Sequence, residues 1–331
     1  MENKYLKQFP DLMVGKKIMY VHGFGSSAQT GTVTRLRKAL PSAKVIAEDM
    51  PLHPCEALDL LHRLCAEEQP DLIIGTSMGG MYTEMLYGYD RIVINPAFQI
   101  GDTMVEHGMM GAQEFFNPRK DGVQRFFVDN NLVKEYKQIT TQCFGGVDDS
   151  ERGRVWGLFG DNDTLVHTFD LFREHYPTAI RYHGEHRVDE RSYMHAVLPV
   201  IRWIDDRQEQ RERPVVLIAI ESARDRLGNP ASSVQKAFRR LIETYQVFFI
   251  APADFNGTSA MADTVAWAQE YFDAPAYNHV LFACQKGLVA ADYLIDTKPC
   301  PDFMGTVITL GSDAFKTWEE VITYFDRLGG Q

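Results

Sequence analysis

The sequence predicts an α/β fold with two domains. Short apolar segments alternate along the chain with segments whose apolar residues recur at helical spacing, which is typical of parallel sheets flanked by helices. The chain has 331 residues, and about 150 residues is a usual size for one domain. A charged run that ends in proline, residues 205–214, has the composition of a linker. We therefore expect one domain over residues 1–209 and a smaller, Rossmann-like one over residues 210–331.

In the first domain, apolar runs and helical periodicity predict alternating strands and helices. The predicted strands cover residues 17–24, 43–50, 71–77, 90–97, 153–163 and 179–188. The predicted helices cover residues 31–40, 55–69, 78–89 and 195–204. Residues 101–150 interrupt the alternation with an insertion rich in Met, Phe, Gly and charged residues. So long a connection predicts either a lid or binding wall, or helices packed on the edge of the sheet.

The second domain shows the same alternation in a shorter chain segment. Its predicted strands cover residues 215–220, 246–252, 279–283, 291–296 and 305–311. Its predicted helices cover residues 232–245, 262–272 and 317–328. This pattern again predicts a parallel sheet with helices.

Composition excludes several classes of partner. The formal net charge is −11, which argues against a surface for nucleic acid or an anionic membrane. No apolar run approaches the roughly 18–20 residues that span a bilayer. The five cysteines are scattered and include no Cys-x-x-Cys pair, which indicates reduced thiols, a cytoplasmic location and no metal site.

The predicted strand at residues 71–77 ends abruptly in small residues around Ser77. The segment Gly75-Thr-Ser-Met-Gly79 fits the nucleophile elbow, a tight turn that presents a serine between a strand and a helix. An ordinary strand-to-helix turn is the alternative interpretation. Because a serine hydroxyl is a weak nucleophile, the first interpretation requires a histidine, a carboxylate and donors for an oxyanion.

The other parts of such a site follow in the expected order along the chain. After Ser77, the strand at 153–163 ends in Asp161 and Asp163, and the strand at 179–188 contains His183 and His186. The order Ser, Asp, His is that of α/β hydrolases. The glycine-rich turn His22-Gly-Phe-Gly25 after the first strand predicts an oxyanion hole built from backbone N–H groups.

Residues 16–205 resemble the α/β-hydrolase superfamily, and within it the YqiA-like branch of small esterases. The resemblance rests on the segments YVHGFGSS, IIGTSMGG, VINPAF, GDND and GEH. It implies hydrolysis of carboxylic esters or thioesters without a metal or other cofactor. The family's nucleophile falls on Ser77, and its oxyanion donors fall on the N–H groups of Phe24 and Met78.

The carboxylate and the histidine each have alternatives. The superfamily pattern Gly-x-x-Asp-x-x-Val favours Asp163, with Asp161 as the alternative. His186 follows a strand and a glycine, as the family's histidine does, and we select it. His183 and His195 remain the alternatives, although His195 begins a predicted helix and suits a packing or capping role.

Residues 278–325 carry a second resemblance, to the carboxyl half of 5′(3′)-deoxyribonucleotidases of the haloacid-dehalogenase superfamily. It rests on Lys286, on the run Asp292-Tyr-Leu-Ile-Asp296 and on the ending Gly-Ser-Asp…Trp-Glu-Glu-Val. It implies a haloacid-dehalogenase-like domain over about residues 213–330. The family's chemistry requires an Asp-x-Asp pair that closes the first strand and holds Mg²⁺.

Several positions of this second motif set have changed. Glu221 stands at the nucleophile position, and Ala223, which cannot transfer a proton, stands at the acid/base position. Pro252 and Ala253 replace the small hydroxyl residue expected after the second strand, and Thr297 replaces an aspartate. We therefore expect a domain that keeps the fold and lacks the phosphatase chemistry.

The sequence as a whole predicts a serine esterase or thioesterase that acts through an acyl-enzyme on a small-molecule substrate. The alternatives are a binding or scaffold protein in which both halves are inactive, and a Mg²⁺-dependent nucleotidase. The second domain has three candidate roles, which are covering the hydrolase cleft, homo-oligomerisation, and binding of a phosphorylated ligand through Lys286.

Overall fold

The computed structural model describes residues 9, 11–231, 233–253 and 258–328. The chain divides into two compact units, Met1–Asp205 and Asp206–Gln331. The division falls within helix α10, Leu198–Gln208, whereas we expected it between residues 209 and 210.

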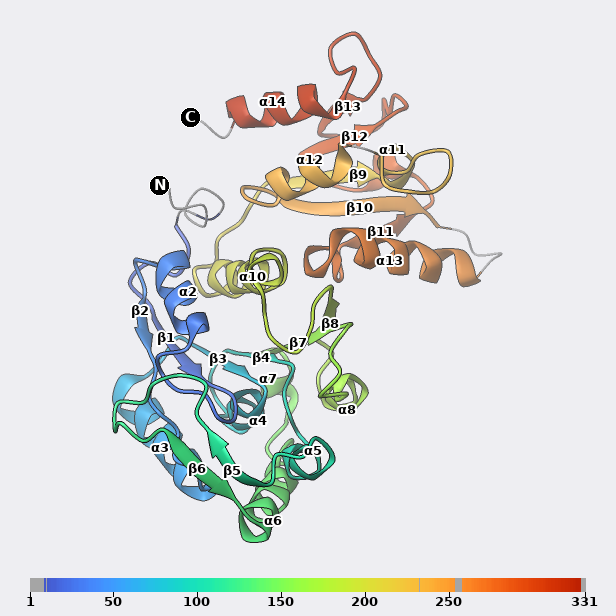
Figure 1. Ribbon diagram of the computed structural model, residues 1–331. Coiled ribbons are helices and arrows are strands. Elements are labelled where there is room, and N and C mark those ends of the chain that lie inside the picture. Colours follow the sequence, from blue (N-terminus) through green and yellow to red (C-terminus); the bar gives the residue numbers. More distant parts are fainter. Residues whose placement is uncertain (1–8, 10, 232, 254–257, 329–331) are drawn as a thin grey trace. The chain divides into compact units, whose positions relative to one another are not determined.

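Six parallel strands form the sheet of the first unit, in the order β2-β1-β3-β4-β7-β8 (Figure 1). Their bounds are β1 Lys17–Val21, β2 Lys44–Ile46, β3 Leu72–Thr76, β4 Arg91–Ile94, β7 Val155–Gly160 and β8 Ala179–Tyr182. All six predicted strands are confirmed, each shorter than its apolar run. The α/β-hydrolase fold class is thereby confirmed for this unit.

The strand order places a topological switch point between β1 and β3. The chain runs from β1 to β2 on one side and then crosses to β3 on the other side of β1. Loops that follow two such strands diverge, and ligand sites of open parallel sheets form in the crevice between them. The turn at residues 22–30 and the turn at Ser77 meet at this point.

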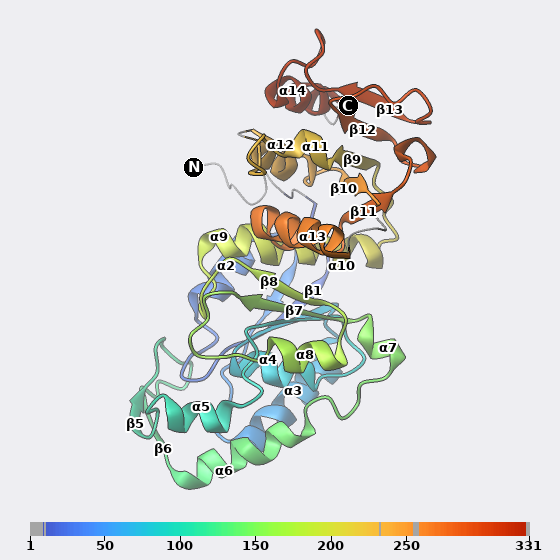
Figure 2. The same cartoon turned by 90° about the vertical axis from the view of Figure 1, so that its right-hand side faces the viewer.

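Helices cover both faces of this sheet. Figure 2 shows α2, α9 and α10 over one face and α3, α4 and α8 over the other. The bounds not yet given are α2 Gly31–Ala39, α3 Pro54–Glu68, α4 Met78–Glu84, α8 Phe169–His175 and α9 Glu190–Ser192. Helix α8 was not predicted, and the helix predicted at 195–204 begins as a π-helical turn, Tyr193–Val197.

The insertion contains helices and also a β-hairpin that the sequence did not predict. Its elements are α5 Ile100–Glu106, β5 Gly111–Glu114, β6 Arg125–Val128, α6 Asn130–Ile139, a 3-10 turn Thr140–Gln142 and α7 Asp149–Arg152. Helix α6 buries Leu132, Val133, Tyr136 and Ile139 against the core that also contains α3 and α4. The insertion is therefore an integral layer of the first unit.

The second unit contains five parallel strands in the order β11-β10-β9-β12-β13. Their bounds are β9 Val215–Ala219, β10 Gln246–Pro252, β11 Val280–Ala283, β12 Tyr293–Asp296 and β13 Thr306–Thr309. The helices are α11 Ile220–Ala223, α12 Val234–Leu241, α13 Thr258–Phe272 and α14 Trp318–Leu328, with 3-10 turns at Ala274–Ala276 and Lys286–Leu288. Ser232, the first residue of the helix predicted at 232–245, lies outside the described residues.

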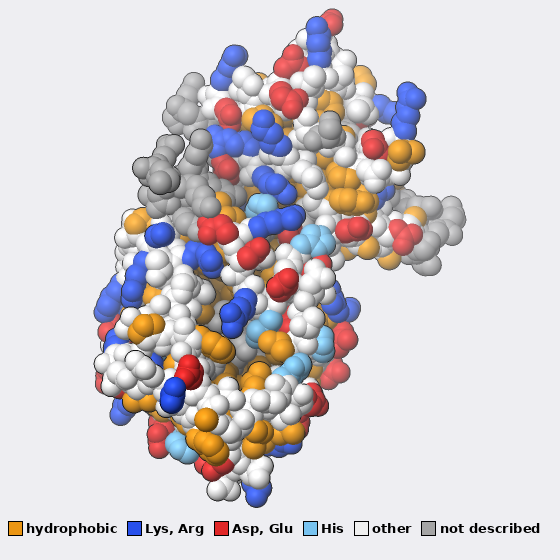
Figure 3. Space-filling model, in the orientation of Figure 1, with side chains coloured by type: hydrophobic (Ala, Val, Ile, Leu, Met, Phe, Trp, Pro, Cys, Tyr) orange, Lys and Arg blue, Asp and Glu red, His pale blue; other side chains and the backbone are white. Residues whose placement is uncertain are grey.

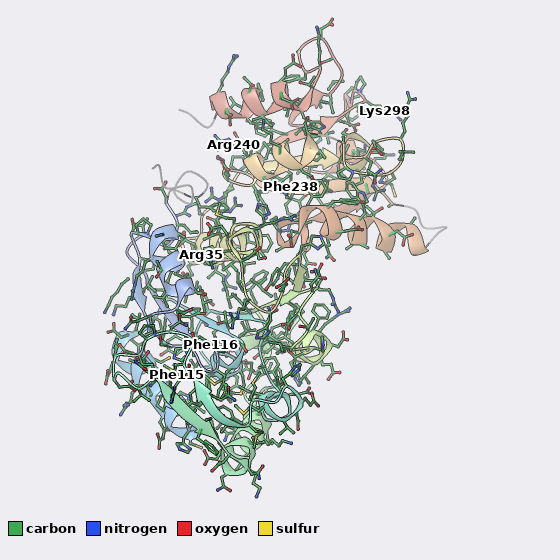
Figure 4. The ribbon with its side chains drawn as sticks, in the orientation of Figure 1. Arg35, Phe115, Phe116, Phe238, Arg240 and Lys298 are labelled. Carbon is green, nitrogen blue, oxygen red and sulfur yellow. The ribbon has the colours of Figure 1, made fainter. Side chains whose placement is uncertain are left out.

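Stacked aromatic rings form the core of the second unit. Phe238 of α12, labelled in Figure 4, stacks on Phe249 of β10 with ring centroids 5.2 Å apart, and Phe249 lies 4.6 Å from Phe272 of α13. The strand order is that of a Rossmann-like sheet, as expected.

Among the described residues of the whole chain, none of the helices is both long enough and apolar enough to cross a bilayer.

Candidate active site

Ser77 occupies a strained bend between β3 and α4. Its backbone has φ 55° and ψ −120°, a region that costs a non-glycine residue about 1–3 kcal/mol. The Ser77 N–H donates to the carbonyl of Ile94 at 2.9 Å, and the Ser77 carbonyl accepts from Met81 at 3.1 Å and Ala97 at 3.0 Å. These three bonds hold the bend, which has the geometry of the predicted nucleophile elbow.

The small residues around Ser77 are required by close backbone contacts. A Cβ atom at Gly79 would lie 2.1 Å from the carbonyl oxygen of Val21, and one at Gly75 would lie 2.2 Å from the carbonyl oxygen of Gly79. At Gly23 it would meet the Cβ of Ser77 at 3.3 Å. Helix α4 therefore packs directly on the ends of β1 and β3, and the turn after β1 lies against Ser77.

The side chains of Ser77, His186 and Asp163 form one hydrogen-bonded chain. His186 Nε2 lies 3.0 Å from Ser77 Oγ, and His186 Nδ1 lies 2.8 Å from Asp163 Oδ2. A carboxylate can only accept, so Nδ1 carries the proton and Nε2 of the neutral ring accepts from the serine hydroxyl. The three residues that we selected from the sequence are thus brought together, 109 positions apart between Ser77 and His186.

Asp163 is placed to remain ionised. It is buried, and its Oδ1 accepts hydrogen bonds from the N–H groups of Leu165 at 2.8 Å and Val166 at 3.0 Å. Burial raises the pKa of Asp163, but the bonds from His186 and these two N–H groups outweigh it and hold the pKa below the ordinary carboxyl value. The carboxylate can therefore orient His186 and balance a positive charge on its ring.

The alternative residues lie elsewhere. Asp161 pairs with His183, with Oδ2 2.5 Å from Nδ1, and this more exposed pair stands beside the chain of Ser77, His186 and Asp163. His195 lies in the π-helical turn after α9. The bonds of Ser77 and Asp163 go to His186, so the structure favours the first choices over all three alternatives.

The predicted oxyanion donors adjoin Ser77. Met78 is the first residue of α4, where an N–H group has no partner within the helix and the helix dipole favours negative charge. Phe24 follows Gly23, which packs on Ser77. Their roles as donors remain a prediction.

His22 holds the turn that carries Phe24. Its Nε2 accepts from the Met50 N–H at 3.0 Å, so Nδ1 carries the proton and donates to the Gly23 carbonyl at 2.8 Å. Burial lowers the pKa of His22, which keeps the ring neutral. This geometry fits the loop-shaping role that its sequence position suggested.

Sequence reasoning missed Asn95, which joins the loops of Asp163 and His186. The buried Asn95 follows β4, its Nδ2 lies 3.0 Å from the carbonyl oxygens of Glu185 and His186, and its Oδ1 accepts from the Gly160 N–H at 2.8 Å. A polar residue directly after the apolar run of β4 was the available signal. Asn95 is a positioning residue for both loops.

Aromatic residues of the insertion pack around the turn at residues 22–30. This turn carries Phe24, a predicted oxyanion donor, and we call it the oxyanion turn. The Phe24 ring lies 5.3 Å from that of Phe126 in β6 and 5.9 Å from that of Tyr136 in α6. The Tyr136 hydroxyl lies 3.2 Å from Met78 Sδ. Aromatic side chains of the insertion therefore pack against Phe24 and Met78, and Tyr136 is fully buried there. A lid or binding wall over residues 101–150 stays a prediction.

In the second unit, three residues of the segments that resemble the nucleotidase motifs pair with one another. Lys286 Nζ lies 2.8 Å from Asp296 Oδ2 and 3.0 Å from Glu221 Oε2. Burial lowers the pKa of Lys286, but these two carboxylates outweigh it and raise the pKa above the ordinary lysine value. Glu221 lies in α11, two residues beyond the end of β9, so the strand ends one residue earlier than predicted, and the assignment of Glu221 to the nucleophile position stays a prediction. Among the described residues, no group of three or more His, Cys, Asp or Glu side chains is arranged to hold a metal ion.

One family model matches most of the first unit. The model is described as "Uncharacterised protein family (UPF0227)" and covers residues 17–192, more than half of the 331 residues. The match supports the resemblance expected for residues 16–205.

Curated relatives match a shorter stretch of the chain. A protein of Vibrio phage KVP40 named "Putative 5'(3')-deoxyribonucleotidase" is 28% identical over 98 residues, which is 29% of this chain and 58% of the relative. A protein of the same name from Staphylococcus aureus strain Mu50 is 32% identical over 102 residues, which is 28% of this chain and 56% of the relative. The chain thus spans little more than half the length of these relatives, and they support a haloacid-dehalogenase-like second domain.

Two of the solved structures that resemble this chain share little of its sequence. A monoacylglycerol lipase of Paleococcus ferrophilus is 15% identical, with a TM-score of 0.41 and coverage of 57% of this chain and 94% of that chain. Est1E from Butyrivibrio proteoclasticus is 18% identical, with a TM-score of 0.39 and coverage of 61% and 90%.

The contact of Gly79 with β1 predicts a large loss of stability in Gly79→Ala. The added methyl group has no space against the backbone of Val21, so we expect a loss of about 2–4 kcal/mol in urea unfolding of the first unit. Gly31→Ala is the matched control, because a Cβ there meets nothing within 4 Å, and its stability should change by less than about 1 kcal/mol. Equal stability of the two variants would refute the close approach.

Asn95→Ala is expected to loosen the loops of Asp163 and His186. It leaves the Gly160 N–H without its acceptor, so we expect a loss of about 1–3 kcal/mol in stability and a fall of roughly tenfold or more in the rate at which a fluorophosphonate probe labels Ser77. Asn162→Ala, which removes a surface amide bonded to Asp161, serves as the control. Labelling of both variants at the wild-type rate would show that Asn95 positions neither loop.

Proposed function

The chain belongs to the uncharacterised protein family UPF0227, and we propose that it is a serine hydrolase that cleaves carboxylic esters or thioesters through an acyl-enzyme. The observation that carries the proposal is the hydrogen-bonded chain from Ser77 Oγ through His186 to Asp163. A hydroxyl on a strained elbow, an imidazole in the required tautomer and an ionised carboxylate are the parts of a nucleophilic site.

The first half of the reaction forms the acyl-enzyme. Ser77 Oγ attacks the acyl carbon while its proton passes to His186 Nε2, and the carbonyl electrons move onto the oxygen. The N–H groups of Phe24 and Met78 bind that oxyanion. When the carbonyl re-forms, the bond to the leaving oxygen or sulfur breaks, and His186 gives its proton to the leaving group.

The second half reverses these steps with water in place of the alcohol or thiol. His186 takes a proton from water, the hydroxide forms a bond to the acyl carbon, and the Ser77 oxygen leaves with the proton from His186. Asp163 stays ionised throughout and stabilises the imidazolium. The protein's own residues supply every proton transfer in this scheme.

The aromatic wall supports an apolar acyl group. The rings of Phe24, Phe126 and Tyr136 pack together next to Met78, and those of Phe24 and Phe126 are partly exposed. Exposed aromatic rings favour apolar ligands. For the second unit we propose a non-catalytic role. Support comes from Lys286, whose ammonium is already paired with Glu221 and Asp296.

Ser77→Ala is the direct test of the proposed function. With p-nitrophenyl acetate we expect a burst of p-nitrophenol followed by turnover in the wild-type protein, and a loss of about 10³-fold or more in the variant. Ser42→Ala, an exposed serine of the first unit, should keep wild-type activity. Absence of both the burst and fluorophosphonate labelling in the wild-type protein would favour the inactive scaffold instead.

The second unit is expected to show no phosphatase activity. With a nucleoside monophosphate and Mg²⁺, release of phosphate by the full chain should equal that of Glu221→Ala, because Glu221 is already engaged with Lys286 and Ala223 has no proton to give. Phosphate release that disappears in Glu221→Ala would overturn this proposal and restore the nucleotidase alternative.

A further inference from the structure

An exposed aromatic ring lies on the oxyanion turn. Phe116 follows β5 and is 67% exposed, and Figure 4 labels it with Phe115 beside the hairpin. Its N–H donates to the Gly25 carbonyl at 2.8 Å, and a Cβ at Gly25 would lie 3.1 Å from its ring. Since Gly25 directly follows Phe24, the Phe116 ring adjoins the turn whose Gly23 packs on Ser77.

A cation covers this ring from the opposite loop. Arg187 directly follows His186 and is exposed, and its guanidinium carbon lies 5.1 Å from the centre of the Phe116 ring. The contact therefore joins the oxyanion turn to the loop at residues 183–189, which carries His186 and which we call the histidine loop. In Figure 3 a blue side chain of Lys or Arg lies beside pale-blue histidine and orange apolar side chains on this face of the first unit.

Arg187 has charge available for a ligand. Neighbouring arginines are paired, since Arg35 lies 3.4 Å from Glu190 and Arg119 lies 3.1 Å from Asp121. Within the described part of the chain, no carboxylate is paired with Arg187. Its fork of N–H donors can therefore bind an anion in a bidentate manner.

The segment that carries Phe116 is fixed before any ligand binds. Ser27 Oγ donates to the Pro118 carbonyl at 2.7 Å, and Asn117 Nδ2 donates to Ser26 Oγ at 3.1 Å. The Lys120 N–H donates to Asp49 Oδ2 at 2.7 Å. A ring held in this way offers Arg187 a preorganised support, which lowers the entropic cost of binding.

Building on the proposed function, we propose that Arg187, stacked on Phe116, binds an anionic group in the leaving part of the substrate. His186 delivers its proton to the leaving oxygen or sulfur, so the alcohol or thiol lies against the histidine loop, where Arg187 follows His186. The acyl part then lies against Phe24 and Phe126, which are partly exposed. In a chain of net charge −11, a local cation is required to attract an anionic substrate.

The recognised chemistry is an oxyanion group that accepts two hydrogen bonds, which a carboxylate or a phosphate provides. The test compares kcat/KM of the wild-type protein and of Arg187→Met for four substrates, which are three acetate esters and one hemisuccinate. The leaving groups are 4-hydroxybenzoate and 4-hydroxyphenyl phosphate, with methyl 4-hydroxybenzoate as the neutral match. The hemisuccinate of methyl 4-hydroxybenzoate places the charge on the acyl side instead.

The expected result is selective. Arg187→Met should lower kcat/KM about fivefold, mainly through KM, for one or both substrates with an anionic leaving group, and less than about twofold for the neutral ester and the hemisuccinate. Comparison of the two substrates with anionic leaving groups shows whether Arg187 recognises a carboxylate or a phosphate. Arg187→Lys should retain part of the preference because it keeps the charge, and about 1 M salt should reduce the wild-type preference.

The controls separate this inference from the proposed function. Arg181→Met removes an exposed arginine that stacks on Phe169 of α8 at 3.9 Å, and should leave all four substrates unchanged. An equal loss on all substrates in Arg187→Met, or a loss on the hemisuccinate alone, would overturn the inference while hydrolysis dependent on Ser77 continues. Absence of that hydrolysis with the neutral ester would overturn the proposed function and the inference with it.

Discussion

The contact of helix α4 with the end of β1 at Gly79 is the constraint on which the rest of the first unit depends. With no side chain at this residue, the helix axis can approach the carbonyl of Val21, and the chain must then turn sharply at Ser77. That turn brings the Ser77 hydroxyl to His186 and makes Met78 the first residue of α4. The absence of a methyl group at Gly79 thus permits the bend that places Ser77.

The remaining parts of the site lie on loops without regular structure, and side chains hold those loops together. Asn95 bonds to the backbone at Gly160, Glu185 and His186, so the end of β4 fixes the loops after β7 and β8. His22 does the same for the turn after β1. Buried Asn95 thus supports the loops of Asp163 and His186, and buried His22 supports the turn that carries Phe24.

The strands, the elbow and the selected triad could be predicted from the sequence because each has a local signature. Buried parallel strands are continuous apolar runs, and the glycines at 75 and 79 report the close packing around Ser77. The hairpin of β5 and β6 has four residues a strand, too few for a clear alternation. Asn95 and the contact of Arg187 with Phe116 depend on which loops meet, and a single sequence does not carry that information. The strand predicted at 215–220 is one residue too long because Ile220 continues the apolar run after the backbone has already become helical.

The pairing of Lys286 with Glu221 and Asp296 has a consequence for how the second unit balances its charges. The carboxylates of Glu221 and Asp296 balance the charge of Lys286. Because they are covalent parts of the chain, they cannot dissociate into the solution as a dissolved counter-ion can. The positive charge of Lys286 is therefore balanced by carboxylates of α11 and β12 within the same unit.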